Sequence, residues 1–343
     1  MFLKLSTKSC DLQEVILSSK NKVIVTGGSG FIGTNLVEFL INQGHDVLNL
    51  DINPPRNCEH IGFWFQVNIL DLEMLSNVIS KFSPSIIYHL AARTDLDGET
   101  ISDYDANTLG VENLIKSIAN NATLKKVIFA SSRLVCKIGY KPSDMEDYCP
   151  DTAYGQSKVL GEKIVRGMSS KILSPWIIVR PTSIWGPWFD IPYKNFFLSI
   201  YRRQYFHPAS MRIKKHFGFV GNTVHQLGVL GSKNCVVAHS QTMYLADYDA
   251  IDVEEMANMI SAEFYNGRIV NLPMYILKSC AHIGDFLKKM GWKNPPLTTF
   301  RLKNLIASME YDLEPLRAVV GPLPYTTHQG VGVTCKWLIS SKG

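Results

Sequence analysis

The stretch Lys22-Val-Ile-Val-Thr-Gly-Gly-Ser-Gly-Phe-Ile-Gly33 decides the fold of this 343-residue chain. Its β-branched beginning has the composition of a buried parallel strand, and an apolar-periodic segment follows the glycines. Two glycine patterns overlap here: G-x-x-G-x-x-G at Gly27, Gly30 and Gly33, and G-x-G-x-x-G when Gly28 is counted first. Residues without a Cβ allow the tight turn and the close backbone approach that a pyrophosphate requires. We therefore predict a strand, a phosphate-binding loop and a helix whose free N–H groups face the phosphates.

An acidic residue follows where a dinucleotide site requires one. After an apolar helix face and a glycine suited to a C-terminal cap, residues 47–50 read as a second strand that ends in Asp51. A carboxylate about 20 residues past the glycine loop is placed to hold the ribose hydroxyls of NAD. This favours NAD over NADP, although Arg56 is close enough in sequence to reach a 2′-phosphate.

The composition is that of a soluble globular protein, with 46% hydrophobic residues and a formal net charge of +5. Lysines and arginines are dispersed, so no nucleic-acid partner is expected, whereas mild positive charge suits an anionic substrate. Seven scattered cysteines without a C-x-x-C pair indicate reduced thiols, with no disulfide framework and no metal site. No apolar run approaches the roughly 18 residues that span a bilayer, so we expect no membrane partner and a cytoplasmic location.

Strand and helix patterns alternate along the first half of the chain. Further strands are predicted at 63–67, 86–90, 127–130 and 176–179, with helices at 72–82, 102–121 and 151–169. This alternation predicts an α/β fold with a doubly wound, Rossmann-like parallel sheet. We assign residues 1–181 to a dinucleotide-binding domain, with 1–21 as an appendage that contains a short helix at 11–18. Residues 182–343 are assigned to a smaller substrate lobe, partly interleaved with the sheet, with helices at 193–203, 222–230, 252–262 and 276–290.

Three polar side chains are expected to meet at the carboxyl edge of this sheet. Ser132 follows the fifth strand, and Tyr154 and Lys158 lie four residues apart on one helix face. A phenol must lose about three pKa units, roughly 4 kcal/mol, to act as a base near neutrality. A neighbouring ammonium and a nicotinamide ring can supply this by favouring the phenolate. Tyr154 would then take a proton from a substrate hydroxyl whose oxygen is held by Ser132, while the adjacent carbon gives up hydride.

Each of these features also has an ordinary structural interpretation. Tyr-x-x-x-Lys is common on helix surfaces, and serines after a strand often serve only as turn residues. His89, at a strand end, reads as a structural histidine with hydrogen-bond partners rather than a base. The aromatic residues near 185–197 read as core. The order and spacing of the four motifs in one chain favour the catalytic interpretation.

The motifs together resemble the extended short-chain dehydrogenase/reductase family, which contains NAD-dependent nucleotide-sugar epimerases and dehydratases. They are Thr26-Gly-Gly-Ser-Gly-Phe-Ile-Gly33, His89-Leu-Ala-Ala92, Asn107, Ser131-Ser132, Tyr154-Gly-Gln-Ser-Lys158 and Arg180-Pro181. The resemblance implies a catalytic role for Ser132, Tyr154 and Lys158. It implies NAD contacts from Gly27, Gly30, Phe31, Ile32, Gly33, Asp51, Asn68, Ile69, Leu90, Ala91, Ala92, Asn107, Tyr154, Lys158, Pro181 and Thr182. Substrate contacts are expected from Arg93, Ser183, Lys215 and Arg301, of which the last two are candidates to bind a diphosphate.

The departures from the family pattern narrow the expected reaction. The 4,6-dehydratases carry an Asp-Glu pair after the catalytic hydroxyl, where this chain has Arg133-Leu134, so dehydration is not expected. We therefore expect an NAD-dependent epimerase or oxidoreductase that acts on a nucleotide-activated sugar. The alternatives are a ketosugar 4-reductase, a hydroxysteroid-type alcohol dehydrogenase and a non-catalytic cofactor-sensing protein. The resemblance also implies a homodimer formed through the helices at 102–121 and 151–169.

Overall fold

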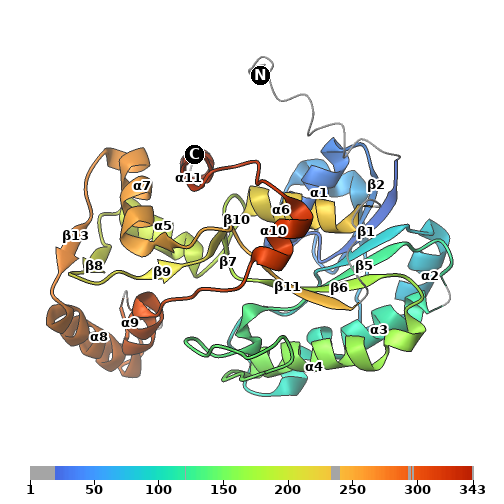
Figure 1. Cartoon of the computed structure of the whole chain (residues 1–343), viewed down its shortest axis with the longest axis horizontal. Coiled ribbons are helices and arrows are strands. Elements are labelled where there is room, and N and C mark those ends of the chain that lie inside the picture. Colours follow the sequence, from blue (N-terminus) through green and yellow to red (C-terminus); the bar gives the residue numbers. More distant parts are fainter. Residues whose placement is uncertain (1–19, 120, 233–239, 293–294, 296, 342–343) are drawn as a thin grey trace, which may run out of the picture.

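A parallel sheet of seven strands forms the centre of the molecule, in the order β11-β6-β5-β4-β1-β2-β3 (Figure 1). The computed structural model describes residues 20–119, 121–232, 240–292, 295 and 297–341. The strands of the sheet are β1 (Lys22–Thr26), β2 (Asp46–Asp51), β3 (Trp64–Gln66), β4 (Ile86–His89), β5 (Lys126–Ala130), β6 (Trp176–Pro181) and β11 (Gln241–Leu245). The strand order reverses between β1 and β4, and ligands of such sheets bind at the carboxyl ends of the strands at this reversal.

Helices cover both faces of the sheet. Helices α1 (Phe31–Asn42) and α6 (Val220–Gly231) pack on one face, and α2 (Leu72–Phe82), α3 (Leu109–Ile118) and α4 (Ala153–Gly167) on the other. The residues of β1 alternate between the two cores, because Val23 and Val25 lie beneath α1 whereas Ile24 lies beneath α2 and α3. This doubly wound arrangement confirms the predicted α/β fold class.

The smaller lobe lies to the left of the sheet in Figure 1. It contains the helices α5 (Tyr193–Tyr201), α7 (Val253–Tyr265), α8 (Met274–Lys289) and α9 (Thr299–Ile306). Three short strand pairs join it: β7 (Ser183–Trp185) with β10 (Phe217–Phe219), β8 (Phe206–Pro208) with β13 (Val270–Leu272), and β9 (Lys214–Lys215) with β12 (Ile251–Asp252). Helix α6 and strand β11 lie between these segments in sequence but belong to the sheet, so the two parts are interleaved. Helices α10 (Glu314–Val320) and α11 (Thr327–Ser340) complete the chain.

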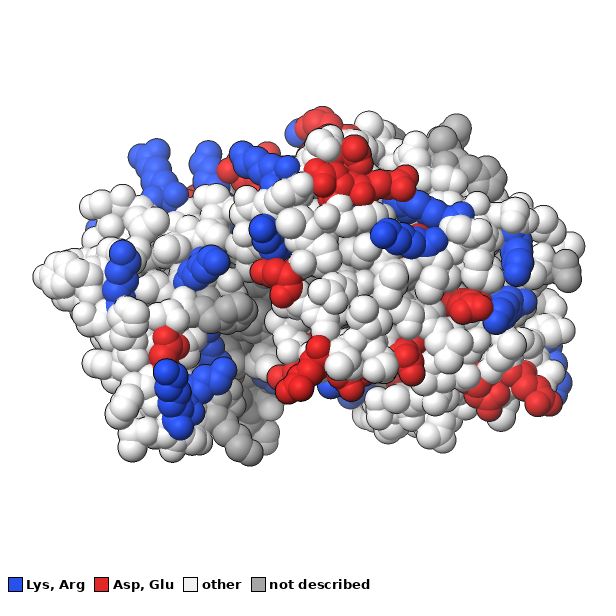
Figure 2. Space-filling model, turned by 90° about the horizontal axis from the view of Figure 1, so that it is seen from below, with Lys and Arg blue, Asp and Glu red and all other residues white. Residues whose placement is uncertain are grey.

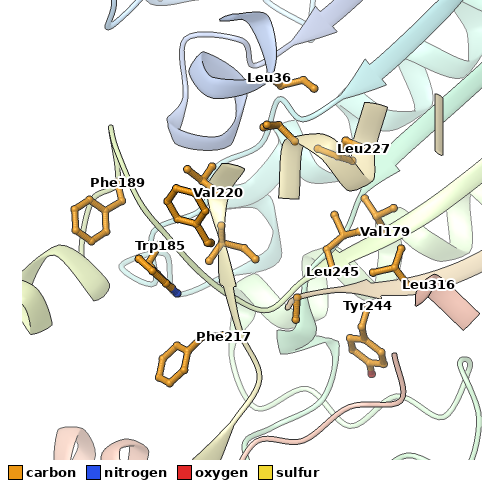
Figure 3. Close-up of a cluster of buried hydrophobic side chains, with 14 of the residues drawn as sticks. Leu36, Val179, Trp185, Phe189, Phe217, Val220, Leu227, Tyr244, Leu245 and Leu316 are labelled. Atoms are coloured by element: carbon orange, nitrogen blue, oxygen red, sulfur yellow. The ribbon is translucent and has the colours of Figure 1, made fainter. Parts of the chain in front are cut away.

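One hydrophobic core runs from the sheet into the lobe (Figure 3). Leu36 of α1 and Val179 of β6 belong to the same cluster as Trp185 and Phe189. The indole of Trp185 is completely buried, and its ring centroid lies 5.4 Å from that of Phe197. The predicted core role of these aromatic residues is therefore confirmed.

The structure differs from the predicted elements in two respects. The helix predicted at 102–121 is broken into a 3-10 helix, η2 (Ile101–Asn107), and α3, because Tyr104 and Thr108 have non-helical backbone angles. Strand β11 and the helices α9, α10 and α11 were not predicted. The short helix predicted at 11–18 lies outside the described residues.

The surface seen in Figure 2 shows lysines and arginines interspersed with acidic residues. This face therefore has no extended area of one sign, as a nucleic-acid surface would require. Among the described helices, none combines the length and the apolar composition needed to cross a bilayer.

Candidate active site

The glycine loop packs so closely against neighbouring backbone that side chains are excluded from it. Gly27 has a φ of 74°, and a Cβ on it would lie 2.5 Å from the backbone nitrogen of Ala91. A Cβ on Gly33 would lie 2.1 Å from the carbonyl oxygen of Gly27. Helix α1 begins at Phe31 after the N-cap Gly30, and no side-chain hydrogen bond caps its first turn. These residues fit a pyrophosphate bound at the N-terminus of the helix.

The side chains around the end of β2 favour NAD over NADP. The carboxylate of Asp51 accepts a hydrogen bond of 3.1 Å from the backbone N–H of Ser29, and burial raises its pKa. The guanidinium of Arg56 lies 2.6 Å from Asp190 and donates to the carbonyl of Trp188 at 2.8 Å. This guanidinium therefore contacts the loop that contains Trp188 and Asp190.

Ser132, Tyr154 and Lys158 meet at the carboxyl edge of the sheet, and each is less than a tenth exposed. Ser132 follows β5, Tyr154 lies in the first turn of α4, and their side chains are hydrogen bonded to each other. The Ser132 hydroxyl also accepts the backbone N–H of Leu134 at 3.1 Å. The ammonium of Lys158 donates to the carbonyl of Ala130 at 3.0 Å. The three predicted catalytic side chains are thus buried together in one corner, at the end of β5 and in the first two turns of α4.

The charges around Tyr154 differ from the expected arrangement. Burial raises the pKa of the Tyr154 phenol, whereas the hydrogen bond from Ser132 and the charge of Arg133 lower it. We predicted that Lys158 would lower this pKa. Burial instead lowers the pKa of Lys158 itself to about 8, and its ammonium is bound to a backbone carbonyl. In this structure Arg133 is the cation that favours the phenolate.

Asn107 connects the loop after β4 to the catalytic helix. Its side-chain oxygen accepts the backbone N–H of Arg93 at 2.9 Å, and its amide donates to the hydroxyl of Ser157 at 2.9 Å. A Cβ on Gly161 would lie 2.7 Å from the carbonyl oxygen of Asn107, so η2 and α4 are in close contact. Since Ser157 precedes Lys158, this geometry is consistent with the predicted supporting role of Asn107.

His89 is structural, as predicted. Its Nδ1 lies 2.8 Å from the hydroxyl of Thr26, and its ring is almost completely buried. Burial, with a smaller contribution from Lys158, lowers the pKa of His89 to about 3. The imidazole is therefore neutral at physiological pH.

A buried ion pair beneath the catalytic corner was not predicted. Arg180 on β6 donates two hydrogen bonds of 2.8 Å to the carboxylate of Glu162 on α4. The same carboxylate accepts the hydroxyls of Ser131 at 2.5 Å and Tyr148 at 2.9 Å. The pair holds α4 against the ends of β5 and β6. Glu162 follows Lys158 by four residues on the same helix face, and this spacing is the sequence signal that points to it.

The other predicted cofactor residues border the same edge of the sheet. They are Phe31 and Ile32 in α1, Asn68 and Ile69 after β3, Leu90, Ala91 and Ala92 after β4, and Pro181 and Thr182 at the end of β6. The Thr182 hydroxyl donates to the carbonyl of Leu245 at 3.0 Å, which ties the end of β6 to β11. Their contacts with NAD remain predictions.

The structure does not gather the four predicted substrate residues. Arg93 is ion-paired within its own loop, and Arg301 is exposed on α9, where it donates to a backbone carbonyl. Ser183 is completely buried on β7, and its contact with a substrate stays a prediction. Lys215 is buried on β9, and burial together with the nearby charge of Arg133 lowers its pKa to about 7.

Arg133 was noted in the sequence only as a departure from the dehydratase pattern. In the structure it is half-buried, and its guanidinium is hydrogen bonded to the phenols of Tyr193 and Tyr311. These tyrosines belong to the smaller lobe, so Arg133 links the two parts of the molecule at the catalytic corner. Its position directly after Ser132 was the available signal.

A second group of polar side chains lies in the smaller lobe. Ligand atoms of His207, Asp252 and Glu254 lie within 4.8 Å of one another. Each has a structural partner, since Asp252 caps α7, Glu254 accepts the amide of Asn271, and His207 contacts the hydroxyl of Tyr205. We therefore assign this group to the packing of the lobe.

The fold and the site define a class of dinucleotide-dependent enzymes, and comparison with known proteins identifies the family. The model of the NAD dependent epimerase/dehydratase family matches residues 23–227. The chain belongs to this family, as the motifs predicted, and the family's dependence on NAD confirms the predicted cofactor.

The relatives and the solved structures agree with this assignment. An N-acetyl-alpha-D-glucosaminyl-diphospho-ditrans,octacis-undecaprenol 4-epimerase of Escherichia coli O157:H7 is 23% identical over 92% of this chain and 95% of its own. A 3-beta-hydroxysteroid dehydrogenase of Mycolicibacterium neoaurum is 26% identical over 70% of this chain and 69% of its own. The UDP-glucose 4-epimerase of Thermotoga maritima, solved with UDP-glucose, has the same fold, with a TM-score of 0.72 at 17% identity over 94% of this chain and 100% of its own.

Proposed function

We propose that this chain is an NAD-dependent epimerase or ketosugar reductase that acts on a hydroxyl of a nucleotide-activated sugar. The observation that carries this proposal is the buried corner of Ser132, Tyr154 and Lys158. Oxidation of an alcohol needs a base for the hydroxyl proton and an acceptor for the hydride. The corner offers the base at the edge of the sheet where the cofactor of this family binds.

The residues of the corner have distinct roles in this mechanism. NAD, when bound by the glycine loop and Asp51, supplies the hydride acceptor. Tyr154 takes the proton of the substrate hydroxyl, and Ser132 holds the same oxygen by a hydrogen bond. Arg133 favours the phenolate form of Tyr154, and the positive nicotinamide ring adds to this effect when it is present. In the reverse direction, the Tyr154 phenol returns the proton to the carbonyl oxygen.

Two features favour a sugar nucleotide over a steroid. Arg133 and Lys215 place positive charge at the interface between the lobes, which suits an anionic substrate rather than an apolar one. The matched 4-epimerase of Escherichia coli covers nearly the whole chain, whereas the matched steroid dehydrogenase covers 70%. Dehydration is disfavoured because Arg133 and Leu134 occupy the place of the acid pair of the dehydratases.

We also propose that the enzyme is a homodimer of a reducing compartment. Leu109 on α3 and Leu160 on α4 are exposed, as residues of a helix-mediated interface would be in one isolated copy. The cysteines at 58, 136, 149, 280 and 335, all within the described ranges, are free thiols. Light scattering coupled to gel filtration tests this proposal. A dimer should have twice the 38.5 kDa mass of one chain.

The proposed reaction is tested with a panel of nucleotide sugars and a hydroxysteroid, with NAD or NADH present. Proton NMR identifies the product, and absorbance follows NADH. An epimerase inverts one carbon without net change in NADH, and a reductase consumes NADH in proportion to product. Turnover of the steroid alone would contradict the assignment to sugar nucleotides.

A further inference from the structure

Arg133 spans the interface between the lobes at the catalytic corner. It is the first residue of the 3-10 helix η3 (Arg133–Val135), which follows β5. Its guanidinium is hydrogen bonded to Tyr193, at the start of α5, and to Tyr311, beyond α9. Tyr311 is itself fixed, because its backbone N–H donates to His216 at 2.9 Å and its ring centroid lies 4.6 Å from that of Tyr244. The backbone of Arg133 belongs to the sheet domain, and its guanidinium is held by two tyrosines of the smaller lobe.

In the part of the chain that the structure describes, no carboxylate forms an ion pair with Arg133. The basic residues that have such a partner there are Arg56, Arg93, Lys116, Arg166, Arg180 and Arg317. The two phenols bound to Arg133 are neutral, and burial raises the pKa of Tyr311 to about 12. A poorly solvated cation without a counter-charge costs stability, and a bound anion removes that cost.

A second cation lies near the first. Lys215 is only 7% exposed, and its ammonium donates to the carbonyl of Asn304 at 2.7 Å. No carboxylate of the described residues pairs with it either. The charge of Arg133 disfavours the charged form of Lys215, and a bound anion would stabilise both cations.

We propose that Arg133, assisted by Lys215, binds a carboxylate carried by the sugar ring of the substrate, which is then a nucleotide-activated sugar acid. The proposal rests on the function proposed above and names the substrate class of the same site. The planar guanidinium can bind a carboxylate through two parallel hydrogen bonds, which a neutral hydroxymethyl group cannot accept in the same way.

A nucleotide-activated sugar acid has two anionic groups, the diphosphate and the carboxylate. The position of Arg133 indicates which of them it binds. Ser132 and Tyr154 hold the reacting oxygen in the proposed mechanism, and Arg133 follows Ser132 directly. The diphosphate is joined to the anomeric carbon, which lies across the ring from a reacting 4-hydroxyl. A cation beside that hydroxyl is therefore closer to a carboxylate on the neighbouring ring carbon than to the diphosphate.

The test measures the binding of UDP, UDP-glucose and UDP-glucuronic acid to the NAD-saturated enzyme by titration calorimetry. Four proteins are compared: the wild type, Arg133→Met, Arg133→Lys and Lys214→Met. Lys214 is the exposed neighbour of Lys215 on β9, so its variant removes a nearby charge and leaves Arg133 and Lys215 in place. NAD affinity and urea unfolding establish that each variant is folded.

We expect the wild type to bind UDP-glucuronic acid at least about tenfold more tightly than UDP-glucose. Arg133→Met should abolish this preference and bind UDP-glucose within about twofold of wild type. Arg133→Lys should keep part of the preference, and Lys214→Met all of it. If Arg133→Met fails to fold, the test uses two other results: the wild type must prefer UDP-glucuronic acid over UDP-glucose, and Arg133→Lys must show a smaller preference.

Three results would overturn the inference, and they are distinguishable. Equal affinity of the wild type for both sugars removes the sugar acid but leaves the proposed function standing. If Arg133→Met binds all three ligands more weakly by the same factor, Arg133 contacts the diphosphate and not a carboxylate. A wild type that binds NAD but none of the three nucleotides refutes the proposed function, and the inference falls with it.

Discussion

The guanidinium of Arg180 lies 2.8 Å from both carboxylate oxygens of Glu162, and both side chains are almost completely buried. Arg180 ends the strand β6, and Glu162 belongs to the helix that carries Tyr154 and Lys158. Since Glu162 also accepts the hydroxyl of Ser131, the pair connects two strand ends with the catalytic helix. We infer that it fixes the position of this helix relative to the sheet.

Removal of this carboxylate should therefore destabilise the whole domain. Glu162→Gln leaves the buried Arg180 without its counter-charge, and we expect the free energy of unfolding to fall by about 3 kcal/mol or more. Glu112→Gln is the matched control, because the Glu112–Lys116 pair is half exposed and its loss should cost less than about 1 kcal/mol. Urea unfolding of both variants measures the difference. Equal effects of the two substitutions would contradict the structural role of the buried pair.

The packing of the glycine loop predicts a strong effect of a single methyl group. Gly33→Ala places a Cβ 2.1 Å from the carbonyl oxygen of Gly27, so the first turn of α1 must move away from β1. We expect NAD affinity to fall at least about tenfold, since the phosphates bind at this turn. Gly167→Ala, at the end of α4, meets no atom within 4 Å and should leave NAD affinity unchanged. Fluorescence titration with NADH compares the two variants.

The preference for NAD can be tested at Asp51. A 2′-phosphate would be repelled by this carboxylate. We expect the wild type to bind NAD at least about 100-fold more tightly than NADP, and Asp51→Asn to reduce this ratio more than tenfold. Titration of both proteins with both cofactors gives the ratios. Similar wild-type affinities for NAD and NADP would show that Asp51 does not select the cofactor.

The lowered pKa of Lys158 predicts a pH dependence of stability. Burial lowers this pKa to about 8, from an ordinary value of 10.5, although Glu162 opposes the shift. Between these two pH values Lys158 carries a proton in the unfolded chain but not in the folded chain. The contribution of Lys158 to the free energy of unfolding therefore rises with pH. Relative to Lys158→Met, the wild type should gain free energy of unfolding between pH 8 and 10.5. The gain approaches about 1.4 kcal/mol per pH unit at most.

Urea unfolding of both proteins at several pH values across this range provides the measurement. Lys215, whose pKa is also lowered, is present in both proteins, so its own titration cancels in the difference. A difference that is constant with pH would show that Lys158 titrates normally in the folded state.

The sequence predicted the sheet well because its signals are local. Val23 to Val25 and the other central strands are short β-branched runs buried on both faces, and Gly30 marks where the first helix begins. The break at Thr108 was missed because it depends on tertiary contacts, such as the hydrogen bond from the Tyr104 hydroxyl to the carbonyl of Asp95. Strand β11 was missed because its sequence, Gln-Thr-Met-Tyr-Leu, lacks the valines and isoleucines that mark the other central strands.

The sequence predicted those residues of the candidate site that belong to recognisable motifs. Ser132, Tyr154 and Lys158 converge as expected, because strand ends and the face of one helix fix their positions. The charge of Arg133 lowers the pKa of the Tyr154 phenol, whereas the role expected of Lys158 stays a prediction. The environment of Arg133 comes from Tyr193 and Tyr311, which are distant in sequence and close only after the lobes have folded.

The central claim is that the Tyr154 phenol exchanges the substrate proton. Its most direct test is the turnover of Tyr154→Phe, with Tyr104→Phe as the control, because the Tyr104 ring lies beside that of Tyr154 at 5.9 Å but its hydroxyl is bound to the loop after β4. We expect kcat to fall by about 10³-fold in Tyr154→Phe, with NAD affinity within about twofold of wild type. A Tyr154→Phe enzyme that turns over within a few fold of wild type would contradict the account.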